Sequence, residues 1–226
     1  MILKKLLFIF LPVFILFSCS STQQRTSAPP GFTVSLDSKQ EPLGIIEMQR
    51  DLLFPRSGLT KESVEIIYFP EEDAVCFKYR SDFFTYHLFL DFNGRELFRN
   101  ALEKYTADYE VRDLTDNSRR TNAIYGNSYG YLIWQEFKFT KKFDGNMEVE
   151  AGYQFKSRSP YFTFTQKQAS YINKLDLKTQ NRSQTITMHF TRAQAQELEA
   201  LLDEELLRSH AVERIIRNGA AEADVW

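Results

Sequence analysis

The chain of 226 residues has little of the features that mark several functional classes. Its 28 lysines and arginines are balanced by 30 acidic residues, and a chain without a positive excess lacks the attraction that drives nucleic-acid binding. Its nine glycines form neither a phosphate-binding loop nor a dinucleotide fingerprint. Its three histidines, His87, His189 and His210, do not have the spacing of metal ligands. The sequence therefore predicts no nucleic-acid partner, no cofactor and no metal.

Long apolar runs are also scarce, and the single one lies at the N-terminus. Lys4 and Lys5 precede an apolar stretch over residues 6–17, which is short for a membrane span. The stretch ends in Leu16-Phe17-Ser18-Cys19, in which a small residue stands directly before the cysteine. This motif resembles the lipobox of bacterial lipoproteins, where a signal peptidase cleaves before a cysteine that carries a diacylglyceryl group. Phe17 departs from the usual pattern, and this laxer form is similar to the lipoboxes of spirochaete lipoproteins.

The resemblance implies that residues 1–18 are a signal peptide and that Cys19 is lipidated. Cleavage would remove Lys4 and Lys5 and no acidic residue, so the formal net charge would move from −2 to −4. Anionic lipid would not attract such a chain, and attachment would depend on acyl chains such as palmitate, at about 0.8 kcal/mol for each buried methylene. Ser20 is compatible with sorting to the outer membrane. We therefore expect a lipid-anchored envelope protein, at either face of the outer membrane rather than at the inner membrane.

Cysteine usage agrees with this expectation. If Cys19 is lipidated, Cys76 is left without an intramolecular partner, and no intramolecular disulfide is possible. Cys76 lies in a strand-like run over residues 74–80, and an unpaired cysteine usually packs as a small apolar residue. We expect a buried thiol.

Composition divides the rest of the chain into a tether, a domain and a short tail. Residues 19–31 are small, polar and proline-containing, which is typical of a flexible linker. Residues 32–218 carry strand and helix patterns, and we expect them to form a single domain. Residues 219–226 are expected to fray.

Alternating apolar residues in this domain predict antiparallel strands. The strands are expected at 64–69, 74–80, 83–91, 129–141, 147–156, 161–165 and 185–190, with a hairpin turn at Asp144-Gly145. Asn93 and Thr191 are expected to cap two amphipathic helices, over about 94–109 and 192–208. These patterns favour an α+β fold, in which antiparallel meanders carry both helices on one face. Residues 63–110 and 124–210 are possible copies of one strands-then-helix unit.

One segment, residues 125–134, supports more than one interpretation. Residues 126–130 (Gly-Asn-Ser-Tyr-Gly) fit the G-x-S-x-G motif of serine hydrolases, but a strand pattern follows where that motif needs a helix. Aromatic side chains there can instead form a surface for an envelope protein or a glycan, because tyrosine offers rigid contact area with a polar tip. The candidate partner-binding residues are Tyr125, Asn127, Tyr129, Tyr131 and Trp134. Alternatively, the tyrosines pack on the sheet around a glycine bend and have no binding role.

From the sequence we expect a membrane-anchored, non-enzymatic binding or scaffolding module of the cell envelope. A carrier of lipid or another apolar ligand is the first alternative, and it requires an enclosed apolar cavity. A serine hydrolase that uses Ser128 is the second alternative.

Overall fold

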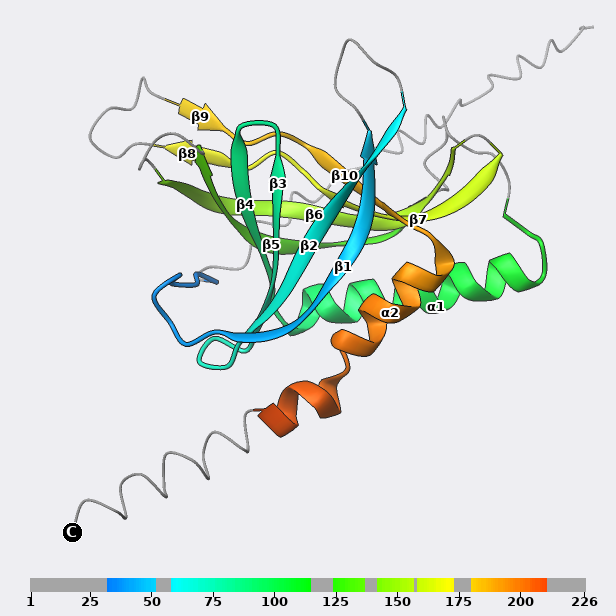
Figure 1. Ribbon diagram of the computed structural model, residues 1–226, viewed down its shortest axis with the longest axis horizontal. Helices are drawn as coiled ribbons and strands as arrows, with labels where there is room; N and C mark the ends of the chain where they lie inside the picture. The colour runs from blue at the N-terminus through cyan, green and yellow to red at the C-terminus, as the bar shows by residue number, and fades with distance from the viewer. Residues whose placement is uncertain are drawn as a thin grey trace, which may run out of the picture.

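The domain is an eight-stranded antiparallel β-barrel with two helices across one end (Figure 1). The computed structural model describes residues 32–51, 58–114, 124–136, 142–156, 158–172 and 180–210. The predicted signal peptide, Cys19, the tether over residues 19–31 and the tail over 219–226 lie outside these residues. In the described part of the chain, no helix has the length and apolar character that crossing a membrane requires.

The strands follow one another up and down around the barrel. The first four are β1 (Glu41–Asp51), β2 (Leu59–Phe69), β3 (Ala74–Ser81) and β4 (Phe84–Leu90), followed by α1 (Phe92–Glu110). The next three are β5 (Ile124–Glu136), β6 (Lys142–Lys156) and β7 (Ser159–Gln166). The next two strands, β8 (Ser170–Ile172) and β9 (Gln180–Arg182), form a separate two-stranded sheet. They are followed by β10 (Ile186–Phe190) and α2 (Arg192–Leu201). Residues 204–210 add a short further helix.

The barrel closes where the last strand meets the first. β10 pairs with β7 on one side and with β1 on the other, so the strand order is β1-β10-β7-β6-β5-β4-β3-β2. The closing seam is short, with Gln49 opposite His189 and Arg50 opposite Met188. The pairing between β2 and β3 begins at their connecting turn and ends at Glu65 and Lys78. Residues 59–64 of β2 and 79–81 of β3 are therefore not paired with each other. The β1–β2 hairpin is therefore held to the rest of the barrel by short ladders.

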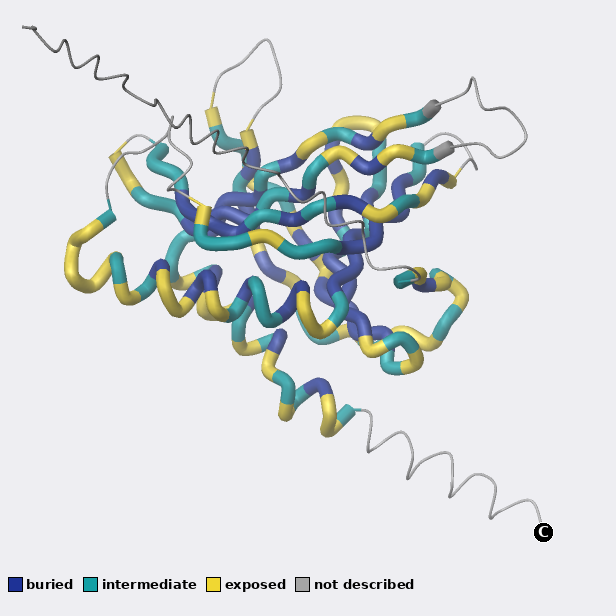
Figure 2. The backbone as a smooth tube through the Cα atoms, turned by 180° about the vertical axis from the view of Figure 1, so that it is seen from behind, coloured by how far each residue is buried: buried dark blue, intermediate teal, exposed yellow. Residues whose placement is uncertain are grey.

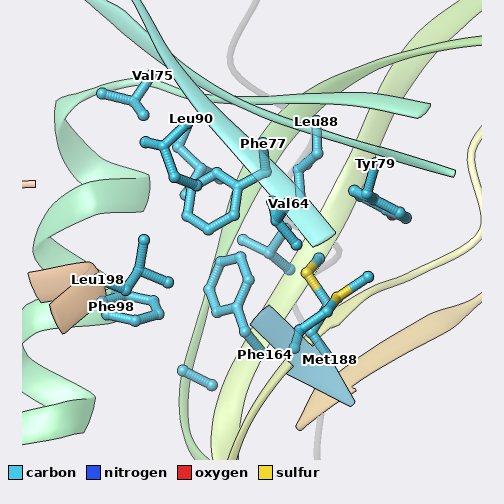
Figure 3. Packing of buried hydrophobic residues seen from close by; sticks show 14 of the residues in the cluster. Val64, Val75, Phe77, Tyr79, Leu88, Leu90, Phe98, Phe164, Met188 and Leu198 are labelled. Atoms are coloured by element: carbon cyan, nitrogen blue, oxygen red, sulfur yellow. The ribbon is translucent and has the colours of Figure 1, made fainter. Parts of the chain in front are cut away.

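Side chains fill the interior of the barrel. Alternate residues of each strand point inward and form one buried cluster, which includes Val64, Phe77, Leu88, Leu132, Phe164 and Met188. Phe98 of α1 and Leu198 of α2 enter this cluster from the end that the helices cover and approach Phe77 and Phe164 (Figure 3). The buried backbone runs through the barrel strands, and the outer sides of both helices are exposed (Figure 2).

The predicted α+β fold is wrong. The sheet does not present one flat face to two helices; it closes on itself, and the helices cover one end of the resulting barrel. Alternation correctly indicated the antiparallel strands, but closure depends on pairing between β1 and β10, which are about 140 residues apart in the sequence. No local pattern encodes such a contact.

Two local predictions are also wrong, and one is confirmed. Asp144-Gly145 is not a turn, because β6 runs through both residues and pairs with Leu132 and Ile133 of β5. The N-cap of α1 is Asp91, whose side chain accepts a hydrogen bond from the Gly94 amide, and not Asn93. The capping box of Thr191 and Gln194 at the start of α2 is present as predicted.

A second apolar cluster lies outside the barrel, on the wall formed by β2 to β5. Its members include Ile67, Phe89 and Tyr131, and it is covered by Phe32, Val34 and Leu36. We call residues 32–36 the strap. Cys76 belongs to this cluster and is a fully buried free thiol, as the sequence predicted. Burial raises the pKa of the Cys76 thiol.

Candidate functional site

The barrel end opposite the helices carries a small cavity lined mostly by polar residues, which we call the rim pocket. Its lining comes from Arg50 and Asp51 at the end of β1, Ser81 at the end of β3 and residues 184–187 at the start of β10. Its volume is about 180 Å³. Mouths of barrels are common ligand sites, because the strands position side chains rigidly around an opening.

Arg50 is the central charged group of the rim pocket. It follows Ile46 and Met48 on the inward face of β1 and is 8% exposed. Its Nη2 atom lies 3.2 Å from Glu62 Oε1 and 3.6 Å from Asp82 Oδ1. Its Nε atom is buried and has no hydrogen-bond partner. This donor has almost no accessible surface, so a ligand in the pocket reaches it only if the side chains of the lining turn.

Two further buried polar atoms at this end also lack partners, Ser81 Oγ and Gln184 Oε1. The Tyr86 hydroxyl is buried beside them and interacts with the backbone of Gln184. Ser81 and Gln184 line the rim pocket, and Tyr86 lies beneath it near the backbone of Gln184. Burial raises the pKa of Tyr86 to about 12, so its hydroxyl stays protonated at neutral pH. Native proteins leave few buried polar groups unpaired, so a cluster of them at one opening requires an explanation.

A side opening lies next to the rim pocket, where β2 and β3 separate. Its volume is about 310 Å³, and Glu62 and Tyr79 line it together with outward-facing residues of both strands. The Tyr79 hydroxyl donates to Gln166 Oε1, and Gln166 Nε2 donates to the Gln184 carbonyl at 3.2 Å. Polar contacts therefore connect the side opening with the segment that borders the rim pocket.

The chemistry available at the rim pocket is hydrogen bonding. Ser81 Oγ has no hydrogen-bond partner, so it is not paired with a general base as a nucleophilic serine would be. Within the residues that the structure describes, no group of three or more histidine, cysteine, aspartate or glutamate side chains could hold a metal ion. The arrangement can bind and orient a small polar molecule.

The structure separates the five candidate residues predicted on β5. Asn127, Tyr129 and Tyr131 share the outer face of the strand, because they alternate along it. Trp134 points into the barrel, where it is 1% exposed and stacks on Phe143. Tyr125 packs toward α1, and its hydroxyl donates to Asp108 Oδ2 at 2.8 Å.

Only part of the outer trio is available to a partner. The strap contacts Tyr131, whose hydroxyl donates to Asp144 Oδ2 at 2.6 Å. Burial and this hydrogen bond raise the pKa of Tyr131. Asn127 is exposed and its amide donates to Glu148 Oε1 at 2.5 Å, and Tyr129 is half-buried. The five residues do not form a common aromatic surface.

The G-x-S-x-G motif has a packing explanation. Gly126, Ser128 and Gly130 alternate on the inward face of β5, on which α1 packs. A Cβ atom at Gly126 would lie 2.8 Å from Leu97 Cδ1 of α1, and one at Gly130 would lie 2.9 Å from the Phe89 carbonyl oxygen. The glycines permit close approach of neighbouring elements, and Ser128 lies in a strand rather than at a strand-to-helix turn.

Sequence reasoning missed the rim residues, although a signal was present. Arg50, Ser81 and Gln166 each occupy the inward phase of a strand whose preceding inward residues are apolar. A polar residue at the same end of three strands indicates a polar opening. Gln184 lies in an irregular segment and gave no such signal.

Comparison with known proteins identifies the family and no function. No curated protein and no solved structure matches the chain. A family model described as "Uncharacterised Treponema protein" matches residues 46–209, which include every rim-pocket residue named above. Treponema is a spirochaete, in agreement with the spirochaete-like form of the lipobox. The match covers more than half of the chain, which therefore belongs to this family of uncharacterised Treponema proteins.

Proposed function

We propose that the chain is a lipid-anchored protein of the cell envelope whose barrel is a non-enzymatic binding module for a small polar ligand. The anchor is lipidated Cys19, and the ligand site is the rim pocket. The tether over residues 19–31 would hold the domain near the bilayer, at the outer membrane, without fixing its orientation.

One observation carries the binding proposal: of the eight buried polar atoms without hydrogen-bond partners in the described residues, three gather at the barrel end opposite the helices. Arg50 Nε, Ser81 Oγ and Gln184 Oε1 all belong to residues that line one cavity. A buried polar atom without a partner costs about 1–3 kcal/mol. A ligand would offset this cost if its binding turns these side chains toward it and so supplies the missing partners.

The alternatives fit the geometry less well. A lipid carrier needs an apolar cavity, but aromatic and aliphatic side chains occupy the barrel interior, and six of the seven residues that line the rim pocket are polar. A hydrolase needs a base beside Ser128, and among the described residues this serine makes no hydrogen bond to a histidine. A partner surface on β5 would have only Asn127 and Tyr129 as accessible members.

The anchor is tested by metabolic labelling of the full chain with an alkyne analogue of palmitate in a bacterial host. Cys19→Ala should abolish the label, and Cys76→Ala should retain it, because Cys76 is buried in the folded domain. Label that persists in Cys19→Ala and disappears in Cys76→Ala would contradict the proposed anchor.

The binding site is tested by soaking crystals of the protein with a mixture of small polar fragments such as glycerol, acetamide and acetate. Fragments are expected in the rim pocket of the wild type. Thr185→Trp places a large side chain at an exposed position of the pocket and should block them, whereas Lys61→Trp on β2 should not. Fragments that bind elsewhere and never enter the rim pocket would contradict the proposal.

A further inference from the structure

We infer that the ligand of the rim pocket is an uncharged molecule rich in hydroxyl or amide groups, about as large as one sugar ring. This inference rests on the proposed function, because it names the chemical class that the rim pocket would select. Three properties of the described residues support it: the balance of charge, the kinds of unpaired atoms and the volume.

The charge of Arg50 is already balanced inside the protein. Glu62 Oε1 lies 3.2 Å and Asp82 Oδ1 3.6 Å from Arg50 Nη2. Asp51, the other charged residue of the lining, is paired with Lys156 at 2.7 Å. An anionic ligand would find no free positive charge and would approach the carboxylates of Glu62 and Asp82. A cationic ligand would find the carboxylates of Glu62 and Asp82 already engaged by Arg50, so it would find no free partner for its charge.

The unpaired atoms of the rim pocket include both donors and acceptors, so a ligand that pairs with all of them must both donate and accept hydrogen bonds. Arg50 Nε is a donor only, and Gln184 Oε1 is an acceptor only. Ser81 Oγ can take either role. A hydroxyl group combines donor and acceptor in one atom, and a primary amide combines them in neighbouring atoms. A carboxylate only accepts and an ammonium only donates, so neither can satisfy the whole set.

The volume limits the size of the ligand. The rim pocket is partly open to solvent and has a volume of about 180 Å³, which is below the ~300–1,000 Å³ of sites that take drug-sized ligands. A single sugar ring or an amide of similar size therefore suits the pocket, and a larger molecule would extend into solvent.

The test uses three probes that share one hexose skeleton and differ in charge: D-glucose, D-glucuronate and, below neutral pH, D-glucosamine. Saturation-transfer NMR on the intact protein should detect D-glucose as a weak ligand. The dissociation constants of the two charged analogues are expected to be at least about tenfold higher, which corresponds to 1.4 kcal/mol. A dissociation constant of D-glucuronate equal to or below that of D-glucose would overturn the inference.

A pair of glutamine variants assigns the signal to the rim pocket. Gln184→Leu removes the Oε1 acceptor and should reduce the D-glucose signal at least threefold. Gln196→Leu makes the same change on the exposed side of α2 and should leave the signal unchanged. An equal signal in wild type and Gln184→Leu would overturn the inference, because the sugar would then bind elsewhere.

The failure of the ligand class can be distinguished from the failure of the site. If none of the three hexoses binds but soaked fragments occupy the rim pocket, the inference on chemical class is wrong and the binding site stands. If neither hexoses nor fragments enter the pocket, the proposed binding function is wrong as well.

Discussion

Arg95 shows how a single buried charge holds three segments of this domain together. It is 2% exposed, and its Nε atom donates to Glu204 Oε1 at 2.7 Å. Its Nη1 atom donates to the Asp73 carbonyl at 2.7 Å, and Nη2 lies 3.1 Å from Asp73 Oδ1. Burial alone would lower the pKa of Arg95, but Glu204 and Asp73 outweigh it and raise the pKa. The β2–β3 turn, α1 and the helix over 204–210 are thereby joined.

Replacement of Arg95 by methionine should lower the free energy of unfolding by about 2–4 kcal/mol. Removal of one member of a buried pair commonly costs about 3–5 kcal/mol, and the exposed Asp73 carboxylate recovers part of this through water. Arg99→Met, at a half-exposed arginine of the same helix, should change stability by less than about 0.5 kcal/mol. Urea denaturation measures both, and similar losses in the two variants would contradict the role given to Arg95.

Substitutions of Gly130 and Ser128 test whether the G-x-S-x-G motif on β5 serves packing or catalysis. A Cβ atom at position 130 would lie 2.9 Å from both the Phe89 carbonyl oxygen and Met147 Cε, so Gly130→Ala should destabilise the domain by about 1–3 kcal/mol. Ser128→Ala should change stability by less than about 0.5 kcal/mol. Urea denaturation checks both values, and a loss confined to Ser128→Ala would reverse this interpretation of the motif.

His87 gives the domain a specific dependence on pH. Burial, followed by the charges of Lys78 and Lys142, lowers the pKa of His87 from 6.5 to about 4. The unfolded chain therefore binds more protons than the folded chain between these values, and the free energy of unfolding falls as the pH drops through this window. Above pH 6.5 the imidazole is neutral in both states and makes no such contribution.

His87→Gln should reduce the loss of stability between pH 7 and pH 4 by about 1–3 kcal/mol relative to the wild type. Comparing the two proteins by urea denaturation cancels the effect of carboxylates, which they share. The same pH dependence in both proteins would show that His87 titrates normally in the folded state.

At the scale of elements, the protection that the strap gives to the Cys76 thiol can be measured directly. Val34 is 5% exposed and lies on the outer cluster that contains Cys76. In a Cys19→Ser background, the Cys76 thiol should react slowly with a thiol reagent, because it is fully buried. Val34→Asp puts a charge into this contact and should raise the labelling rate at least about tenfold.

Ile45→Asp is the matched control for the strap, because it introduces the same charge at a position on β1 that is 66% exposed. Its labelling rate should equal that of the wild type. If Val34→Asp labels no faster than Ile45→Asp while both remain folded, the strap does not protect Cys76.

Local signals predicted most elements but not all of their ends. The Thr191–Gln194 capping box was readable because both partners lie within four residues of each other. Asp91 and Asn93 both have side chains that are favoured at an N-cap, so the sequence alone did not show that Asp91 is the N-cap of α1. Asp144-Gly145 resembles a turn, but Gly145 lies inside β6, where a Cβ atom would be 3.1 Å from the Ser170 carbonyl oxygen. A glycine required by close approach looks in sequence like a glycine required by a turn.

At the scale of the whole molecule, closure of the barrel was not predictable from the chain. The inward alternation along β1 and β10 is visible in the sequence, but their pairing at Gln49 and His189 joins distant segments. The candidate site depends on this closure, because Arg50 and residues 184–187 come from the two strands that meet at the seam. The residues predicted on β5 are separated for a different reason: Trp134 is three positions from Tyr131, and alternate residues of a strand point to opposite faces.

The central claim is that the unpaired polar atoms of the rim pocket serve a ligand and not the fold. The free energy of unfolding of the double variant Ser81→Ala/Gln184→Leu, measured without ligand in urea, tests it most directly. Both changes remove polar atoms that have no partner in the protein, so we predict that stability stays within about 0.5 kcal/mol of the wild type or increases. A loss of more than about 2 kcal/mol would show that these atoms support the barrel itself and would contradict the claim.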